Sequence, residues 1–349
     1  MENEALAQAT DGMEQGYNEN SLIQKSAIQS SNIYIQQAIN ALDTDPLPLI
    51  MIADYGSSHG SNSVYAIQQI IQTLKERKKI DSDKQQILVV HNDLPTNNWK
   101  LLFEVLGKDN SYYGVASGRS FYERCLPSNS LAIGYSSMSM HWLSRKPCNL
   151  SDRCLVDCTR DDSETKAFKN QAALDYEHFL EHRSYELLPG GILILGILDG
   201  GSDEDTHKHA DILYRCAQAF LSSAELLDFT IPIYCRTYDE CVDHQLFAKH
   251  NFELIIADVV IVDSPLGRQL ENGEITLDDL ARTETTAVRS ALEYPLKQAL
   301  LINGQRSAEE IETVLNQYWN MHETEVKEHL CAFTNDLKVI NLVLKKLKK

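Results

Sequence analysis

The chain has 349 residues, and 43% of them are hydrophobic, as expected for a protein with a sizeable packed core. Acidic residues outnumber basic ones by 50 to 32, which gives a formal net charge of −18. This balance argues against a nucleic-acid partner, because phosphate binding needs clustered lysine and arginine. The chain has no apolar run near the ~20 residues that span a bilayer and no signal-peptide core at its start, so we expect no membrane partner.

The eight cysteines are scattered along the chain, and none forms a Cys-x-x-Cys pair. A chain of this length has its own core and needs no disulfides to hold it together. We therefore interpret the cysteines as reduced thiols and predict a cytoplasmic protein.

The first two hundred residues alternate between helical and strand patterns. A helix is predicted over 21–41, and the run 47–53 before Asp54 is typical of a buried parallel strand. Further buried strands are predicted at 86–92, 131–135 and 192–198. Further helices are predicted at 63–79, 97–106 and 166–188, the last one ending at Pro189-Gly190-Gly191. This alternation indicates a parallel sheet with helices on both faces.

After residue 204 helical patterns dominate. They occupy 207–225, 238–249, 276–282, 288–302 and 308–333, with a polar strip at 264–279. Late strands are predicted at 252–262 and 337–344, the last inserted antiparallel. We predict a doubly wound, Rossmann-like α/β sheet of the class I methyltransferase type, with a mostly helical cap. The core is assigned to 1–204, 251–264 and 335–349, and the cap over the substrate pocket to 205–250 and 265–334.

A loop with two glycines follows the first predicted strand. Gly56 and Gly60 permit a tight turn and the close approach of a ligand to the backbone. Asp54 can pair with a ligand ammonium, and Asp93 at the end of the next strand can accept both hydroxyls of a ribose. S-adenosylmethionine (SAM) has an ammonium and a ribose but no pyrophosphate. The loop is neither GxGxxG, which lowers NAD and FAD as alternatives, nor GxxxxGK[ST], which excludes a P-loop.

Five stretches carry a family resemblance. They are YNENSLIQ at 17–24, DYGSSHGSN at 54–62, NDLPTN at 92–97, SFYERCLP at 120–127 and SSMSMHWLS at 136–144. Together they resemble the plant-type salicylate, benzoate and theobromine (SABATH) methyltransferases. The resemblance implies a SAM-dependent enzyme that converts carboxylic acids to methyl esters, although some members methylate ring nitrogens. It also implies a homodimer.

The resemblance implies a role for each matched residue in cofactor binding. Ser21, Asp54 and Asn62 would hold the methionine part of SAM. Asp93 and Leu94 would take the ribose and adenine. The full implied cofactor set is Tyr17, Ser21, Asp54, Gly56, Asn62, Asp93, Leu94, Ser120 and Phe121.

The resemblance also implies a substrate site. Gln24 and Trp142 would donate hydrogen bonds to the substrate carboxylate, and His141 could add a contact. Met138 stands where the family usually has an aromatic residue, which alters the acyl pocket. We expect a small, largely apolar carboxylic acid as substrate and partner.

The chemistry suits neutral donors at this site. A carboxylate is already ionised at neutral pH, so its methylation needs no general base. The protein has only to hold one oxygen about 3 Å from the methyl group, in line with the sulfur. An ion pair with lysine or arginine would stabilise the anion in its ground state and reduce its nucleophilicity. A glutamine amide and an indole N–H leave one oxygen lone pair free.

Two alternatives remain open from the sequence. The same scaffold could methylate a ring nitrogen of a small heterocycle, or it could be a non-catalytic SAM-binding protein. The pattern His178-x-x-Glu181-His182 matches a zinc-peptidase motif. No third ligand is indicated, so we interpret this segment as part of the helix before Pro189 and predict no metal.

Overall fold

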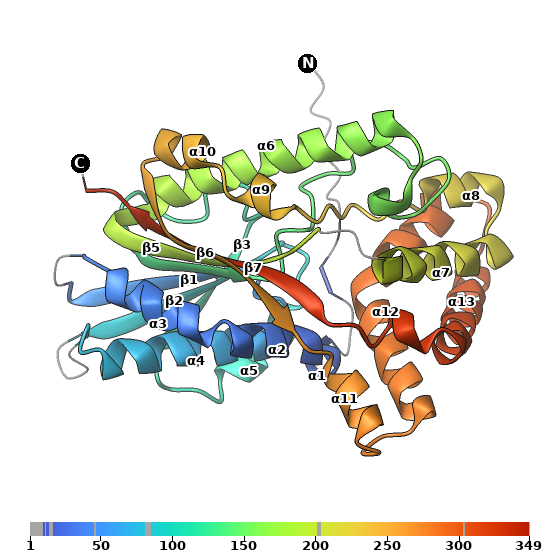
Figure 1. Cartoon of the computed structure of the whole chain (residues 1–349), viewed down its shortest axis with the longest axis horizontal. Helices are drawn as coiled ribbons and strands as arrows, with labels where there is room; N and C mark the ends of the chain where they lie inside the picture. The colour runs from blue at the N-terminus through green and yellow to red at the C-terminus, as the bar shows by residue number, and fades with distance from the viewer. Residues whose placement is uncertain are drawn as a thin grey trace.

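The computed structural model describes residues 10, 12–13, 17–44, 47–80, 85–200, 204–302 and 304–348 (Figure 1), without the side chains of 19 and 204–206. Seven strands form one sheet in the order β3-β2-β1-β4-β5-β7-β6. Strands β1 to β5 are parallel, and β7 runs antiparallel between β5 and β6. The strands are β1 (Leu49–Tyr55), β2 (Gln86–Asp93), β3 (Tyr113–Gly118), β4 (Leu131–Ser137), β5 (Leu187–Leu198), β6 (Phe252–Val262) and β7 (Leu337–Lys346). The predicted doubly wound α/β class, with its antiparallel last strand, is confirmed.

Helices cover both faces of the sheet and form a separate group beside it (Figure 1). On the faces lie α2 (Leu22–Ser30), α3 (Asn32–Ala41), α4 (Ser61–Glu76), α5 (Trp99–Leu106), α6 (Asp162–Glu186), α9 (Tyr238–Cys241) and α10 (His244–Lys249). Beside the sheet lie α7 (Glu204–Phe220), α8 (Ser223–Asp228), α11 (Pro265–Glu271), α12 (Leu277–Ile302) and α13 (Ala308–Glu328). Three short segments complete the described elements: α1 (Tyr17–Asn20), η1 (Val156–Cys158) and η2 (Leu330–Ala332).

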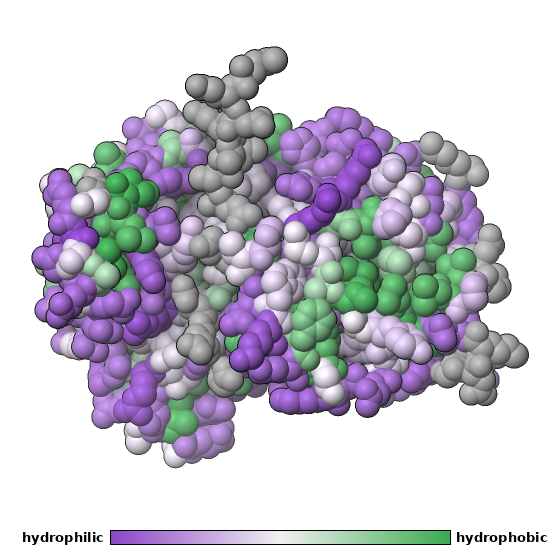
Figure 2. Space-filling view, turned by 180° about the vertical axis from the view of Figure 1, so that it is seen from behind, coloured by the Kyte–Doolittle hydropathy of each residue, from purple (hydrophilic) through white to green (hydrophobic). Residues whose placement is uncertain are grey.

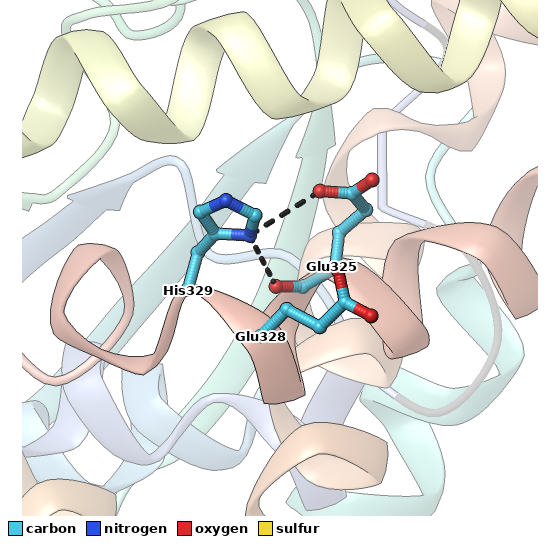
Figure 3. A group of neighbouring side chains, drawn as sticks. All are labelled: Glu325, Glu328 and His329. Carbon is cyan, nitrogen blue, oxygen red and sulfur yellow. Dashed lines mark hydrogen bonds and ion pairs between the residues drawn. The ribbon is translucent and has the colours of Figure 1, made fainter.

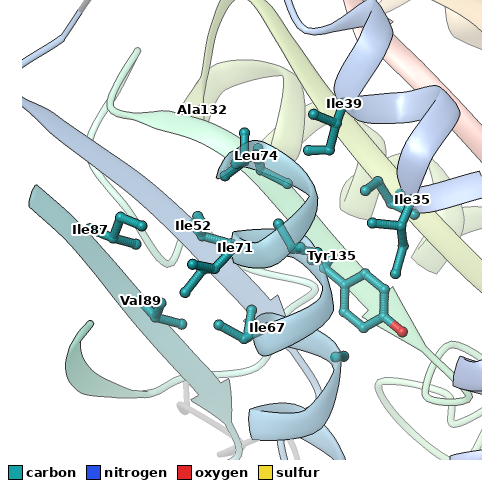
Figure 4. Close-up of a cluster of buried hydrophobic side chains, with 14 of the residues drawn as sticks. Ile35, Ile39, Ile52, Ile67, Ile71, Leu74, Ile87, Val89, Ala132 and Tyr135 are labelled. Carbon is teal, nitrogen blue, oxygen red and sulfur yellow. The ribbon is translucent and has the colours of Figure 1, made fainter. Parts of the chain in front are cut away.

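The largest core cluster lies between α3, α4 and the sheet (Figure 4). Ile67 and Ile71 sit one helical turn apart on α4, so both point to the same strands. They meet Ile52 of β1 and Val89 of β2, all fully buried or nearly so. Burying such side chains contributes about 1.5–3 kcal/mol each. This packing holds β1, β2 and β4 in register and therefore fixes the edge at which these strands end.

The helical cap has its own apolar cluster. Tyr318 and Trp319 of α13 pack with Leu296 of α12 and Leu213 of α7. Residues of α9 and α10 join instead the cluster on the second face of the sheet, beside Phe179 of α6. Our division of the chain stays a proposal, and this packing favours moving 238–249 from the cap to the core.

Several predicted helical segments are divided or joined in the structure. The segment 21–41 divides at Ser31, whose hydroxyl donates to the Ile28 carbonyl at 2.8 Å. The segments 207–225 and 238–249 are each two helices, α7 with α8 and α9 with α10. Conversely, 276–282 and 288–302 are one helix, α12, because a buried contact supports its polar middle. The Thr285 hydroxyl lies 3.0 Å from His322 Nδ1 of α13.

Two features of the strands differ from the prediction. β3 was not predicted, because it is an edge strand whose side chains are mostly exposed and which therefore lacks an apolar run. The long helix was predicted to end at Pro189, whereas α6 ends at Glu186 and β5 starts at Leu187. Pro189-Gly190-Gly191 forms a bulge inside β5, where β4 advances two residues and β5 advances five.

Among the described residues, no helix is long and apolar enough to cross a membrane. Figure 2 views the molecule from behind and shows apolar surface on the lobe that contains the sheet. Exposed apolar residues at the β3 edge include Phe103, Tyr113 and Val115.

Candidate active site

A cavity of ≈ 390 Å³ opens at the carboxyl ends of the parallel strands. Ligands bind in this position in open α/β sheets. The loop after β1 is tied to the end of β2, because Gly56 N–H and Ser57 N–H both donate to the Asn92 carbonyl (2.9 and 3.0 Å). Of the predicted residues, the cavity wall includes Tyr17, Gly56, Asp93, Leu94, Ser120, Phe121, Met138 and Trp142.

A smaller hollow of ≈ 30 Å³ adjoins this cavity and shares part of its wall. Its predicted members are Tyr17, Gln24, Asp54, Gly56, Asn62 and Met138. Ser21 stands behind Asn62, whose amide donates to the Ser21 hydroxyl at 2.9 Å. This bond joins the start of α2 to the start of α4. His141 lines neither space, but its ring lies 6.0 Å from that of Trp142.

The glycines of the β1–α4 loop are required by space as well as by backbone angle. Gly56 has φ +94°, and a Cβ there would lie 2.2 Å from Ser139 Oγ. Gly60 has φ +100°, and a Cβ there would lie 2.7 Å from a Leu102 methyl group. Both conditions leave glycine as the residue that fits.

Two buried carboxylates face the cavities from neighbouring strands. Burial raises the pKa of Asp54 to about 7, against a hydrogen bond from Ser63 that lowers it. Burial also raises the pKa of Asp93, whose oxygens accept from Ser58 N–H (2.6 Å) and Leu94 N–H (2.8 Å). Among the described residues neither carboxylate has an ion-pair partner, so the site favours a cationic or hydroxyl-bearing ligand.

The Gln24 amide lacks a hydrogen-bond partner among the described residues, and its oxygen is buried. The Trp142 side chain is 8% exposed, and its indole N–H likewise has no partner in the described part of the chain. Burial and the nearby Arg236 lower the pKa of His141 to about 4, so its imidazole is neutral at pH 7. These donors can bind an anion without placing a full positive charge against it.

Met138 has an unusual backbone. Its φ of +54° lies in the left-handed region, which residues other than glycine and asparagine rarely adopt. Its N–H donates to the Gly196 carbonyl at 2.8 Å, and its side chain packs with Ala27 and Val339. Such strain costs of order 1–3 kcal/mol and is concentrated at functional sites.

Comparison with known proteins decides the family. Residues 4–346 match a family described as SAM dependent carboxyl methyltransferase. The chain belongs to this family. The predicted family, enzyme class and cofactor, SAM, are thereby confirmed.

Relatives of this carboxyl methyltransferase include a probable S-adenosylmethionine-dependent methyltransferase of Arabidopsis thaliana. It is 33% identical over 253 residues, which cover 64% of this chain and 70% of that protein. The benzoic acid/salicylic acid carboxyl methyltransferase 2 of Petunia hybrida is 32% identical over 244 residues, covering 62% and 68%. A solved loganic acid methyltransferase with SAH has the same fold, with TM-score 0.79, 22% identity and coverage of 97% and 99%.

Three residues of the carboxyl methyltransferase site were not singled out from sequence. Ser139 sets the space at Gly56, Ser58 donates to Asp93, and Asn92 receives the loop N–H groups. All three belong to the matched stretches, but their roles depend on contacts between strands. Ser58 also has φ +48°, which no sequence pattern indicated.

The His178–His182 pair remains a helix-face feature in the structure. Their rings stack with centroids 6.4 Å apart, and His178 lines the cavity of ≈ 390 Å³. Among the described residues, Glu325, Glu328 and His329 lie close enough together to be considered as metal ligands (Figure 3). Glu325 is already paired with Arg215 and His329, so we assign no metal site there.

Proposed function

We propose that this protein forms the methyl ester of a small carboxylic acid, whose carboxylate is held by Gln24 and Trp142. The observation that carries the proposal is that the Gln24 amide and the Trp142 indole N–H line the two spaces without a hydrogen-bond partner among the described residues. The buried Gln24 oxygen is an acceptor, so the amide binds a carboxylate through its NH₂ group, which a turn of the side-chain amide presents to the ligand. His141 lines neither space, and we propose that it supports the tether through its ring contact with Trp142.

The residues around the two cavities fit SAM. We propose that Ser21, Asp54 and Asn62 hold its methionine part, and that Asp93 and Leu94 hold its adenosine. Tyr17, Gly56, Ser120 and Phe121 complete the proposed set. When bound, SAM supplies an electrophilic methyl group. The residues of this chain bind and orient the acid, leave one carboxylate lone pair free, and exclude water under the cap.

Two substitutions test the carboxylate tether. Gln24→Ala and Trp142→Phe each remove hydrogen-bond donors, and phenylalanine keeps most of the ring packing. A hydrogen bond to a charged group contributes about 1.5–3 kcal/mol, so we expect kcat/KM for an acid to fall about 10- to 100-fold in each variant. Transfer of labelled methyl groups to a panel of acids measures this, and lability of the product to mild base identifies an ester.

Gln29→Ala is the matched control, because Gln29 is exposed on the same helix α2. It should leave kcat/KM unchanged. SAH affinity should be unaffected in all three variants. Full activity in both Gln24→Ala and Trp142→Phe would contradict the tether, and a base-stable product would favour N-methylation.

The homodimer and the cytoplasmic location are retained as proposals. Light scattering of the purified protein tests the first, and fractionation of its cells of origin tests the second.

A further inference from the structure

A second cavity, of ≈ 510 Å³, lies between the cap and the carboxyl end of β5. Two neighbours on α2 divide the spaces: Ile23 lines the second cavity, and Gln24 lines the Asp54 hollow. Tyr234 also lines the second cavity, and its N–H donates to the His141 carbonyl at 2.9 Å. These contacts place the second cavity behind α2 and next to the segment that carries Trp142, and it shares no described wall residue with the cavity of ≈ 390 Å³ or with the Asp54 hollow.

The wall of this cavity combines apolar side chains with acidic and histidine ones. Its described acidic and histidine side chains are Asp157, Asp199, His207, His209, Glu284 and Asp336. Lys338 is the single lysine or arginine among the described wall residues. An acid whose far end is negatively charged would be repelled here, because like charges at short range disfavour binding.

Glu284 faces this cavity from α12 without a partner. Among the described residues it makes neither a hydrogen bond nor an ion pair, whereas Asp336 accepts from Ser264 N–H at 3.0 Å. Burial raises the pKa of Glu284 to about 7. A half-buried carboxyl group without a partner among the described residues can accept a hydrogen bond from a ligand, and in its protonated form it can also donate one.

His209 faces the same cavity from α7. Its Nε2 is buried and has no hydrogen-bond partner among the described residues. Its ring packs against Phe333 at 4.8 Å and lies 6.1 Å from His322, which is itself fixed to Thr285. Burial lowers the pKa of His209 to about 4, so the ring is neutral and offers one donor and one acceptor.

We propose that the acid methylated by this protein carries a hydroxyl group on the part that extends away from its carboxylate, and that Glu284 and His209 bind this hydroxyl. A hydroxyl both donates and accepts, so it matches an acceptor on one helix and a neutral imidazole on the other. A hydrocarbon end would leave both side chains unsatisfied. The inference rests on the proposed function, because it places the carboxylate at Gln24 and Trp142.

The test is a matched set of straight-chain acids of six to twelve carbons. Each length is supplied unsubstituted and with a terminal hydroxyl, amino or carboxyl group. Calorimetry with SAH-saturated protein measures binding without methyl transfer. At the best-binding length we expect the hydroxy acid to bind about tenfold more tightly than the unsubstituted acid, with the dicarboxylic acid weakest. The proposal would be overturned if the hydroxy acid and the unsubstituted acid bound equally, if neither bound, or if the acid with a terminal amino group bound more tightly than the hydroxy acid.

Substitution at Glu284 separates recognition from folding. Glu284→Leu should remove the preference for the hydroxy acid while leaving the unsubstituted acid and SAH bound as before. Glu284→Gln keeps an acceptor and should retain the preference. The control is Glu312→Leu, which changes an exposed glutamate of α13 and should alter nothing. An equal loss for both acids in Glu284→Leu would contradict hydroxyl recognition.

The two proposals can fail separately. If the hydroxy acid binds selectively but no ester forms with SAM, the proposed function fails and the hydroxyl site stands. If esters form from both acids without preference, the proposed function stands and the hydroxyl site fails.

Discussion

Single residues at this site sit in environments that isolated side chains avoid. Asp54 is 4% exposed without a paired cation in the described chain, and Met138 has a left-handed backbone. Gly56 touches Ser139 so closely that any side chain would collide. Each feature costs free energy when no ligand is bound. For Asp54, a bound cationic ligand can directly offset the cost of burying its carboxylate.

The raised pKa of Asp54 predicts that cofactor binding depends on pH. With a pKa of about 7, the carboxyl group is protonated below this pH and ionised above it. The proposed partner is the ammonium of SAM or SAH, which needs the ionised form. We expect the Kd for SAH to rise about tenfold per pH unit below about pH 7. Calorimetry from about pH 5.5 to pH 8 measures this dependence.

Asp54→Asn is the control for this titration. It should weaken SAH binding at pH 8 and flatten the pH dependence, because asparagine does not ionise. A wild-type Kd that stays constant across the range would refute the role of Asp54. A residual slope in the variant would be assigned to Asp93, whose pKa is also raised.

At the scale of elements, the bulge in β5 shows how a turn sequence can lie inside a strand. Pro189 and two glycines predicted the end of a helix, yet β5 passes through them. Gly190 has φ +82°, and its carbonyl accepts from Asp43 N–H at 3.0 Å. The bulge thus ties the end of α3 to the sheet, and the missing side chain is what allows the contact.

Gly190→Ala should destabilise the fold more than an alanine at an open glycine with similar φ. Its Cβ would lie 1.9 Å from the Asp43 carbonyl oxygen, so the backbone would have to move. We expect a loss of more than about 2 kcal/mol. Gly273→Ala is the comparison, since Gly273 has φ +70° and nothing within 4 Å. Its loss should be smaller, about 1–2 kcal/mol for the left-handed backbone alone, and equal urea midpoints for the two variants would contradict the steric argument.

For the whole molecule, two lobes with separate apolar clusters enclose the cavities between them. The net charge of −18 acts on both ligands from a distance. At neutral pH the sulfonium and the ammonium of SAM are each positive and its carboxylate is negative, so its net charge is about +1. The acid substrate is an anion, so the long-range field has opposite effects on the two.

Salt should therefore move the two Michaelis constants in opposite directions. Raising ionic strength from about 0.01 M to 0.15 M shortens the screening length from about 30 Å to about 8 Å. We expect KM for the acid to fall and KM for SAM to rise, each by roughly twofold. Steady-state kinetics in potassium chloride measures both, with sucrose of equal osmolality as control. A change of the same sign for both ligands would rule out this electrostatic account.

The sequence by itself determined the parts of this protein that depend on local pattern. Buried strands appear as apolar runs, so the sheet class followed from the pattern, and the family followed from the resemblance of the five motif stretches. It could not show β3, whose exposed edge has no pattern, or the bulge at Gly190, because both depend on neighbouring strands.

Only the tertiary structure brings together the residues to which we assign the far end of the substrate. Ile23, His209 and Glu284 lie on α2, α7 and α12, and Phe333 follows η2, so up to hundreds of residues separate them in the sequence. Each is unremarkable in its own stretch of sequence, and the sequence suggested a largely apolar acid. Their shared cavity arises from how the cap packs on the sheet. Contacts of that kind depend on side-chain shape across elements, which periodicity along one element does not encode.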